Sequence, residues 1–393
     1  RNGDPGDVFS GGNDAVSGGN DVVSGGNDVV SGGSDIKSPD SLSNGGQPGL
    51  TDDVERAALS RVAAIYRTIA DSSGGLWGGA YKMETIPTYL VRRDASGKGL
   101  HGFLLHHPSP PSDAKLIRTA DAGGLSDVYR WDGAVDQVVA DTTFEFTYSL
   151  NGAKTYVMPF RDTGEESFES VQQQFLFLHE GFHRFQEVEG GWTNADGTPV
   201  VDSFPLTQTN LELVLLEDRT LLNGLKATAK ADKITALRRF LAIRETRRSL
   251  DQSVRDALTV EEIGERIEGT PTYIEALYAS IAGVTDPFTV QNLPAGRLEI
   301  TFLYDGAGKR DLIEYFAGAR YYGSGGALCL LLDEAGVVGW RAAIASGATL
   351  TKVIGDALPV SNQEIAALLE DAKSATSFEA ELKPLAQRYA AAK

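Results

Sequence analysis

One stretch of the chain has residue types and spacing that could bind a metal ion. Residues 175–186 read FLFLHEGFHRFQ, and within them His179, Glu180 and His183 form the pattern H-E-x-x-H. Residues four apart lie on one face of an α-helix, so His179 and His183 can bind a single ion. The Glu180 carboxylate would lie beside them, where it could take a proton from a water that the ion activates. The pattern predicts a metal-dependent hydrolase.

A helix that carries this pattern is well signalled by its neighbours. Thr163 and Glu166 have the spacing of a capping box, which predicts a helix start there, and Gly190-Gly191 would end the helix. Apolar residues recur between them at intervals of three and four: Phe168, Val171, Phe175, Leu178, Phe182 and Phe185. The two histidines lie beside this apolar stripe. We therefore expect them to face the interior of a cleft.

Two histidines do not complete a catalytic zinc site, which holds three protein ligands and a water. Cys329, the only cysteine, lies in a leucine-rich run, which excludes a cysteine-rich metal site. His106 and His107 are adjacent on a probable strand and would point to opposite faces, so we interpret them as an ordinary exposed pair at a strand end. A carboxylate from a downstream helix is therefore favoured as the third ligand. The candidates are Glu217, Glu268 and Glu275.

The segment EGTPTYIE, from Glu268 to Glu275, together with HEGFH resembles the gluzincins, the thermolysin-like zinc peptidases. It is most similar to their aminopeptidase N and glycyl aminopeptidase branches, in which HExxH is followed by E-G-x-x-x-Y-x-E. In those enzymes the first Glu of that segment completes the zinc site, so the resemblance implies that Glu268 is the third ligand and Glu275 a supporting residue. The separation between His183 and Glu268 is much longer than in the named branches. Glu217, on the next helix after the motif, therefore stays open as the alternative.

A third segment, residues 321–333 (YYGSGGALCLLLD), is similar to the glycyl aminopeptidase segment Y-Y-x-K-G, with Ser324 in the place of the lysine. The resemblance implies that Tyr322 donates a hydrogen bond to the oxyanion, with Tyr321 as its competitor. A phenol beside zinc can stabilise charge that develops only in the transition state. The alternative is that both tyrosines only cap a buried helix. Nothing matches the exopeptidase signature of the aminopeptidases, so the resemblance does not extend to that activity.

Composition limits the classes of partner. The chain has 393 residues, 36 of them basic and 54 acidic, for a net charge of −18. Such a charge disfavours binding to nucleic acid or to anionic lipid. No apolar run reaches the length of a membrane span, and a single cysteine excludes an intramolecular disulfide. The length allows a two-lobed unit with a sizeable core.

Three segments are expected along the chain. Residues 1–48 form a flexible tether rich in Gly, Ser, Asn and Asp, residues 49–160 a strand-rich N-terminal lobe, and residues 161–393 a helical catalytic lobe that carries HExxH. The tether contains seven-residue repeats such as SGGNDVV, whose Gly-Gly pairs disfavour a helix. Calcium binding is the alternative for these repeats. A tether of this kind, and Arg1 in place of Met, predict a protein that is secreted or held at the cell surface or in the periplasm.

The sequence also predicts the elements that must position the site. Asp52 and Asp53 open an amphipathic helix, and Asn151-Gly152 has the composition of a hairpin turn. The expected strands are Ile86–Val91, Gly102–His106, Thr143–Tyr148 and Lys154–Met158. Helices are expected from Thr209 to about Ala229 and over residues 232–250. The second has a basic face, which we interpret as internal salt bridging rather than recognition of an anionic substrate: Arg238, Arg239, Arg244, Arg247 and Arg248.

These observations predict an α+β protein with a zincin-like, two-lobed fold and the active-site helix between the lobes. The predicted activity is zinc-dependent hydrolysis of a peptide or protein substrate. Three residues would hold Zn²⁺: His179, His183 and Glu268. Glu180 would act as the general base and Tyr322 would support the oxyanion. Two alternatives stay open: a catalytically inactive zincin-fold surface binding module, and a zinc hydrolase of a non-peptide amide.

Overall fold

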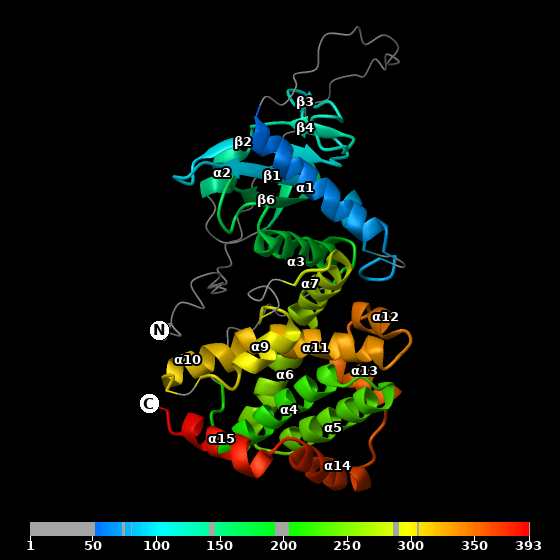
Figure 1. The fold of residues 1–393 in the computed structure, drawn as a ribbon, viewed down its shortest axis with the longest axis vertical. Coiled ribbons are helices and arrows are strands. Elements are labelled where there is room, and N and C mark those ends of the chain that lie inside the picture. The colour runs from blue at the N-terminus through cyan, green and yellow to red at the C-terminus, as the bar shows by residue number, and fades with distance from the viewer. Residues whose placement is uncertain are drawn as a thin grey trace, which may run out of the picture.

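The computed structural model describes residues 52–72, 75–79, 81–140, 146–192, 204–285, 291–304 and 306–392. Within these ranges every strand lies between Thr88 and Phe160, and most of the helices follow (Figure 1). The protein is therefore a mixed α/β structure of the predicted α+β type. The predicted tether, residues 1–48, lies outside the described residues. No helix in the described ranges combines the length and the apolar character that a bilayer crossing requires.

The strands of the described residues form one mixed sheet in the order β3-β4-β2-β1-β6-β5. Their bounds are β1 (Thr88–Arg93), β2 (Gly99–Leu105), β3 (Lys115–Leu116), β4 (Val128–Arg130), β5 (Thr147–Leu150) and β6 (Ala153–Phe160). Strand β1 pairs antiparallel with β2 and parallel with β6. Strands β5 and β6 form a hairpin whose turn residues Asn151 and Gly152 both have positive φ, which confirms the predicted turn.

Side chains alternate along each strand, so each face of the sheet presents its own set, and helices cover both faces. One set of side chains joins helices α1 (Asp53–Ala70) and α3 (Val171–Val188) in the main core: Leu90, Phe103, Leu105, Tyr156 and Met158. The other set packs with α2 (Val135–Ala140): Tyr89, Val91, Leu104 and Val157. Helix α1 is capped by Asp52, as predicted. The sheet therefore gives α3 a fixed support.

The remaining helices form the lower part of the molecule in Figure 1. Their bounds are α4 (Gln208–Lys226), α5 (Lys230–Arg248), α6 (Gln252–Ile267), α9 (Pro294–Ile300), α10 (Lys309–Glu314), α11 (Arg320–Glu334), α12 (Trp340–Ala345), α13 (Leu350–Ala357), α14 (Asn362–Ala375) and α15 (Lys383–Ala390), with the short π-helices η3 (Tyr315–Ala319) and η4 (Phe378–Leu382). Helix α7 (Gly269–Ala282) lies above them in Figure 1, and the short 3₁₀ helix η2 (Met83–Thr85) precedes β1. Helices α3 and α7 lie between these helices and the sheet, and the main core continues through them to α11.

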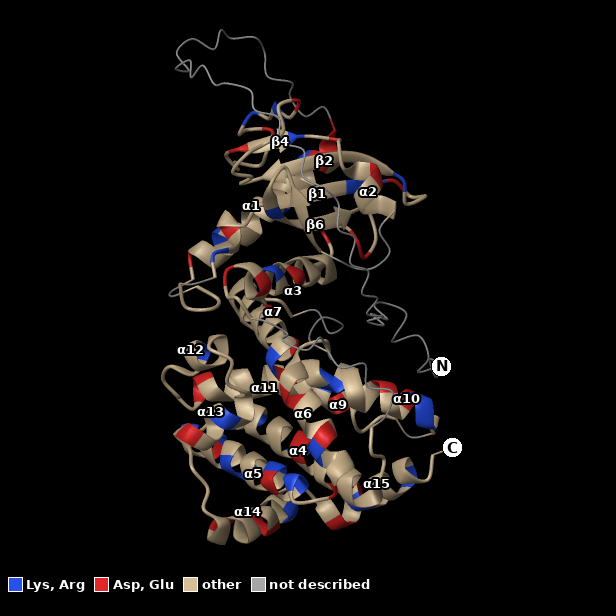
Figure 2. Cartoon of the chain, turned by 180° about the vertical axis from the view of Figure 1, so that it is seen from behind, with Lys and Arg blue, Asp and Glu red and all other residues tan. Residues whose placement is uncertain are grey.

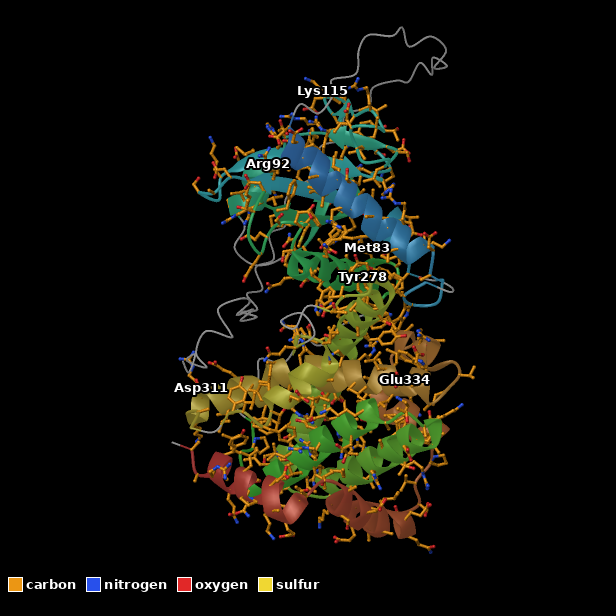
Figure 3. The ribbon with its side chains drawn as sticks, in the orientation of Figure 1. Met83, Arg92, Lys115, Tyr278, Asp311 and Glu334 are labelled. Carbon is orange, nitrogen blue, oxygen red and sulfur yellow. The ribbon has the colours of Figure 1, made fainter. Side chains whose placement is uncertain are left out.

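Side chains from η2 and from α7 hold α3 in place. Met83 and Tyr278 lie at the level of α3 in Figure 3. The hydroxyl of Tyr278, on α7, donates to Oε1 of Gln174 at 3.0 Å. A Cβ added at Gly181 would lie 2.6 Å from Cε of Met83, so the glycine inside HEGFH leaves the room that this methionine fills. The position of the motif is therefore fixed by packing on two sides.

The predicted start of this helix at Thr163 is wrong. Residues 161–170 form turns, and α3 begins at Val171 with Ser170 as its cap. The Ser170 hydroxyl accepts from the amide of Gln172 at 3.2 Å. Helix α4 likewise begins one residue before Thr209, with Thr207 as its cap. A capping-box pattern marks a helix start only where the backbone of the cap residue is extended, and the pattern alone does not show this.

The basic face of α5 is neutralised internally, as predicted. Arg238 pairs with Glu364 at 2.6 Å and Arg239 with Asp371 at 2.7 Å, both on α14. The other three arginines pair with glutamates of α4, α5 and α6: Arg244, Arg247 and Arg248. Charges of both signs accordingly alternate over these helices in Figure 2.

Candidate metal centre

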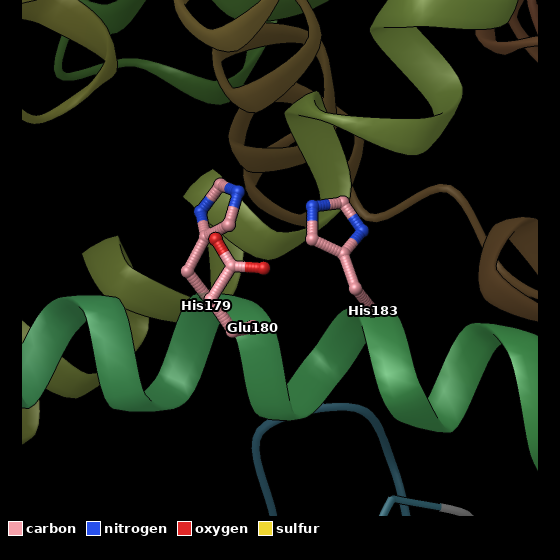
Figure 4. Close-up of side chains that lie close together, drawn as sticks. All are labelled: His179, Glu180 and His183. Atoms are coloured by element: carbon pink, nitrogen blue, oxygen red, sulfur yellow. The ribbon is translucent and has the colours of Figure 1, made fainter. Parts of the chain in front are cut away.

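Helix α3 presents the three residues of the motif on one side. Figure 4 shows the imidazoles of His179 and His183 and the carboxylate of Glu180 projecting from the same face of the helix. The potential ligand atoms of these three side chains lie within 4.8 Å of one another. His179 is buried, and the other two are half-buried. The motif therefore faces a partly enclosed space.

Glu268, the residue between α6 and α7, brings a carboxylate to the same point. Its Oε2 lies 3.5 Å from Nε2 of His179 and 3.3 Å from Nε2 of His183. In a tetrahedral site with bonds of about 2.0–2.2 Å, the range found for zinc, two ligand atoms lie about 3.3–3.6 Å apart. The two distances from the Glu268 oxygen thus match the separation between ligands of a shared ion. Among the sequence candidates, Glu268 is the carboxylate that the structure brings to both imidazoles.

The second nitrogen of each imidazole has its own acceptor. Nδ1 of His179 lies 2.6 Å from Oε1 of Glu275, and Nδ1 of His183 lies 2.8 Å from Oε1 of Gln186. The Gln186 amide is oriented by its NH₂ group, which donates to the carbonyl of Ile267 at 3.1 Å. Because a carbonyl can only accept, the Gln186 oxygen must face the histidine, and Nδ1 of His183 must carry the hydrogen. The lone pair of Nε2 is then directed to the metal site.

Gln186 is the functional residue that sequence reasoning missed. Its signal was its position three residues after His183, which places both side chains on one face of α3. Gln186 also donates to Oγ1 of Thr270 at 2.8 Å, so it connects α3 to the junction of α6 and α7. The same side chain therefore orients a histidine and holds the segment that carries Glu268.

The carboxylates make the site favour positive charge. Burial opposes protonation of His179, but Glu275 and Glu268 outweigh it and raise its pKa to about 10 in the metal-free chain. Burial also opposes protonation of His183, and the charge of Glu268 raises that pKa too. Burial alone would raise the pKa of Glu268, yet the charges of both imidazoles hold it far below its ordinary value. Positive charge is therefore favoured between these side chains.

A close helix crossing puts Glu268 in place. Gly269, the first residue of α7, passes over Gly325 of α11, and a Cβ added at Gly269 would lie 2.4 Å from the Gly325 Cα. No larger residue fits this crossing without a backbone shift. Pro271 lies in the first turn of α7, where its missing N–H costs no helical hydrogen bond. The crossing joins the segment of Glu268 to the helix that carries Tyr322.

Tyr322 faces His179, whereas Tyr321 packs elsewhere. The Tyr322 ring stacks on the His179 ring with centroids 5.6 Å apart and an interplanar angle of 17°. Burial and the neighbouring carboxylate of Glu268 raise the pKa of Tyr322 well above its ordinary value, so the phenol keeps its proton and can donate it in a hydrogen bond. Tyr321 instead packs on Gly264, where an added Cβ would lie 2.2 Å from the ring.

Glu217 lies in a different cluster. Its carboxylate accepts from Arg244 at 2.9 Å, from Arg247 at 2.7 Å and from Arg320 at 3.0 Å, and it is fully buried there. These three arginines donate hydrogen bonds to the carboxylate that the sequence left open as a third ligand. The structure therefore does not bring Glu217 to the histidine pair.

The two upstream histidines also lie elsewhere. Nε2 of His107 lies 3.0 Å from the carbonyl of Leu150, and the side chain is buried, so the prediction of an exposed pair is wrong for this residue. His106 lies just after β2 rather than at its last position as predicted, is half-buried rather than exposed, and has its ring 5.8 Å from that of Tyr66. Burial lowers the pKa of His106. Both side chains contribute to the packing of the sheet rather than to the metal centre.

Glu275→Gln should weaken metal binding about 10- to 100-fold, because the imidazole of His179 loses the charged partner that raises its basicity. The amide still accepts a hydrogen bond, so the fold should be kept. Competition with a chromophoric chelator would measure the affinity. Glu370→Gln, which changes an exposed carboxylate on α14, is the matched control. Equal affinities in the two variants would show that the Glu275 contact does not tune the site.

Neither family models, nor curated proteins, nor solved structures gave a match to this chain, so the assignment of its function depends on the residues and their geometry.

Proposed function

We propose that the protein is a zinc-dependent peptidase with a zincin-like catalytic unit, in which α3 carries the catalytic motif between the sheet and the helices. The observation that carries the proposal is the position of the Glu268 Oε2 atom, 3.5 Å and 3.3 Å from the Nε2 atoms of His179 and His183. Two imidazoles and one carboxylate, with a further carboxylate beside them, form a donor set typical of hydrolytic zinc sites. The similarity to gluzincins at three short segments, which contain these same residues, is consistent with the assignment.

A zinc ion bound there would supply Lewis-acid polarisation of the scissile carbonyl and of the attacking water. Glu180 accepts the proton that this water loses and passes it to the nitrogen of the leaving amine. The protonated phenol of Tyr322 donates a hydrogen bond to the oxygen on which negative charge develops. Glu275 and Gln186 hold the two imidazoles in the orientation that the reaction needs. The two imidazoles and the Tyr322 ring are thus already oriented by neighbouring side chains.

Metal removal is the experiment that tests this function. The purified chain is expected to hold about one zinc ion and to cleave members of a peptide library. A chelator should abolish cleavage, and added zinc should restore it. Elemental analysis and mass spectrometry of the digest would measure the two properties on the same sample.

Each contrary outcome has a distinct meaning. Bound zinc without any hydrolysis would favour a binding module that keeps the scaffold. Zinc with cleavage of non-peptide amides alone would keep the chemistry and change the substrate. Absence of zinc, or cleavage that resists the chelator, would overturn the proposal.

A further inference from the structure

A guanidinium lies next to the candidate metal centre. Arg297, on α9, places its Cζ atom 5.1 Å from the centroid of the Tyr322 ring. The same ring stacks on His179 at 5.6 Å. A cation, a phenol and a metal-site imidazole from three different helices therefore lie in one stack. Arg297 is half-buried, so part of its side chain is exposed to solvent.

The donors of Arg297 are only partly used. Its Nε donates to the carbonyl of Asn292 at 2.6 Å. No carboxylate of the described residues forms an ion pair with Arg297, although most arginines of α5 and α11 have such partners. Contact with the face of an aromatic ring leaves the edge of a guanidinium and its Nη donors available. The carboxylates of Glu180 and Glu268, which also act on Tyr322, would by themselves repel an anionic substrate group.

We propose that Arg297 binds a carboxylate of the substrate close to the scissile bond, so that the enzyme prefers peptides with a negative charge at that position. A planar guanidinium matches a carboxylate in two parallel hydrogen bonds, and this match gives orientation as well as affinity. The carboxylate has two possible sources, the C-terminus of the peptide and an Asp or Glu side chain. This inference depends on the proposed peptidase function, which it deepens by naming a substrate class.

Arg297 could instead serve only to hold Tyr322 in place. The two roles differ in their dependence on the substrate. A group that positions Tyr322 affects every peptide equally, whereas a group that binds a carboxylate affects only the peptides that carry one. A comparison of matched peptides therefore separates the two roles.

The test uses two pairs of peptides that the wild-type chain cleaves. One pair differs in a free or amidated C-terminus, and the other in an internal Glu or Gln near the cleavage site. Binding is measured by titration calorimetry to the zinc-loaded Glu180→Gln protein, with and without Arg297→Gln, and kcat/KM is measured without the Glu180 change. Arg310→Gln, on the exposed face of α10, is the matched control. Arg297→Lys shows whether a charge alone is sufficient.

Arg297→Gln should weaken binding of the carboxylate member of one pair roughly 10- to 100-fold and leave its neutral partner unchanged. The pair that shows the loss identifies the source of the carboxylate. An equal loss for both members, or no loss in either pair, would overturn the inference while the peptidase proposal stands. A wild-type chain that holds no zinc and cleaves no peptide would overturn both.

Discussion

Glu180→Gln should lower kcat about 10²- to 10⁴-fold while the chain keeps its metal, because an amide cannot accept the proton of the attacking water. The substitution preserves the shape of the side chain. The ligand atoms are expected to stay in place, since the carboxylate that faces both Nε2 atoms belongs to Glu268 and not to Glu180. KM should change little, because the lost interaction acts in the transition state. Peptide turnover and zinc content, measured on the same preparation, would check both parts of the expectation.

Glu187→Gln is the matched control for this prediction. Glu187 lies about two turns further along α3, is exposed, and contacts Lys154 at 3.5 Å. Its substitution should leave turnover unchanged. Near-wild-type hydrolysis by the Glu180 variant would contradict the mechanism. Loss of zinc from the Glu180 variant, with zinc retained by a Glu268→Gln variant, would show that Glu180 is the metal ligand and that Glu268 is not.

The local part of the site could be predicted from the sequence because it depends on one helix. The spacing of His179 and His183 fixes their shared face wherever the helix lies. Neither β3 nor β4 was predicted, since strands of two and three residues are too short to show an alternating pattern. The existence of α3 was predictable and its first residue was not, because the choice of Ser170 as the cap depends on the backbone of the preceding turns.

The third carboxylate depends on long-range packing, which local patterns do not encode. Glu217 and Glu268 are both glutamates downstream of the motif, and only the resemblance to gluzincins separated them. In the structure the two residues have different partners: arginines surround Glu217, and imidazoles face Glu268. The sequence did contain a partial signal for the first environment. Arg244 and Arg247 continue the spacing of the buried residues Leu237 and Phe240 along α5, so their side chains had to enter the core and meet acidic partners there.

The cluster around Glu217 connects four helices through buried charges. Arg320 of α11 pairs with Asp218 at 2.6 Å and with Glu217 at 3.0 Å, both on α4, and also with Glu261 of α6. All four side chains are almost completely buried. Burial opposes ionisation of Asp218 and raises its pKa above the ordinary value, even though the charge of Arg320 acts in the opposite direction. The acidic members of the cluster therefore depend on their arginines to be tolerated inside the protein.

Arg320→Met should lower the free energy of unfolding by about 3–5 kcal/mol, since it leaves buried carboxylates without their cation. Urea denaturation followed by circular dichroism would measure the change. Arg310→Met, which removes an exposed arginine paired with Glu314, should have little effect. If the two variants unfolded at the same urea concentration, the buried cluster would not have the contacts described.

The same variant tests how the cluster supports the metal centre. Arg320 lies two residues before Tyr322 on α11, and its partner Glu261 lies two turns before Glu268 on α6. Loss of the Arg320–Glu261 contact should therefore loosen the two segments that converge on His179, and zinc affinity should fall together with stability. Added zinc should recover part of the lost stability, because it binds only the folded chain. Titration of zinc into Arg320→Met at a urea concentration that unfolds half of the chains would measure this recovery. If the variant had reduced stability but wild-type zinc affinity, the cluster and the metal centre would be independent.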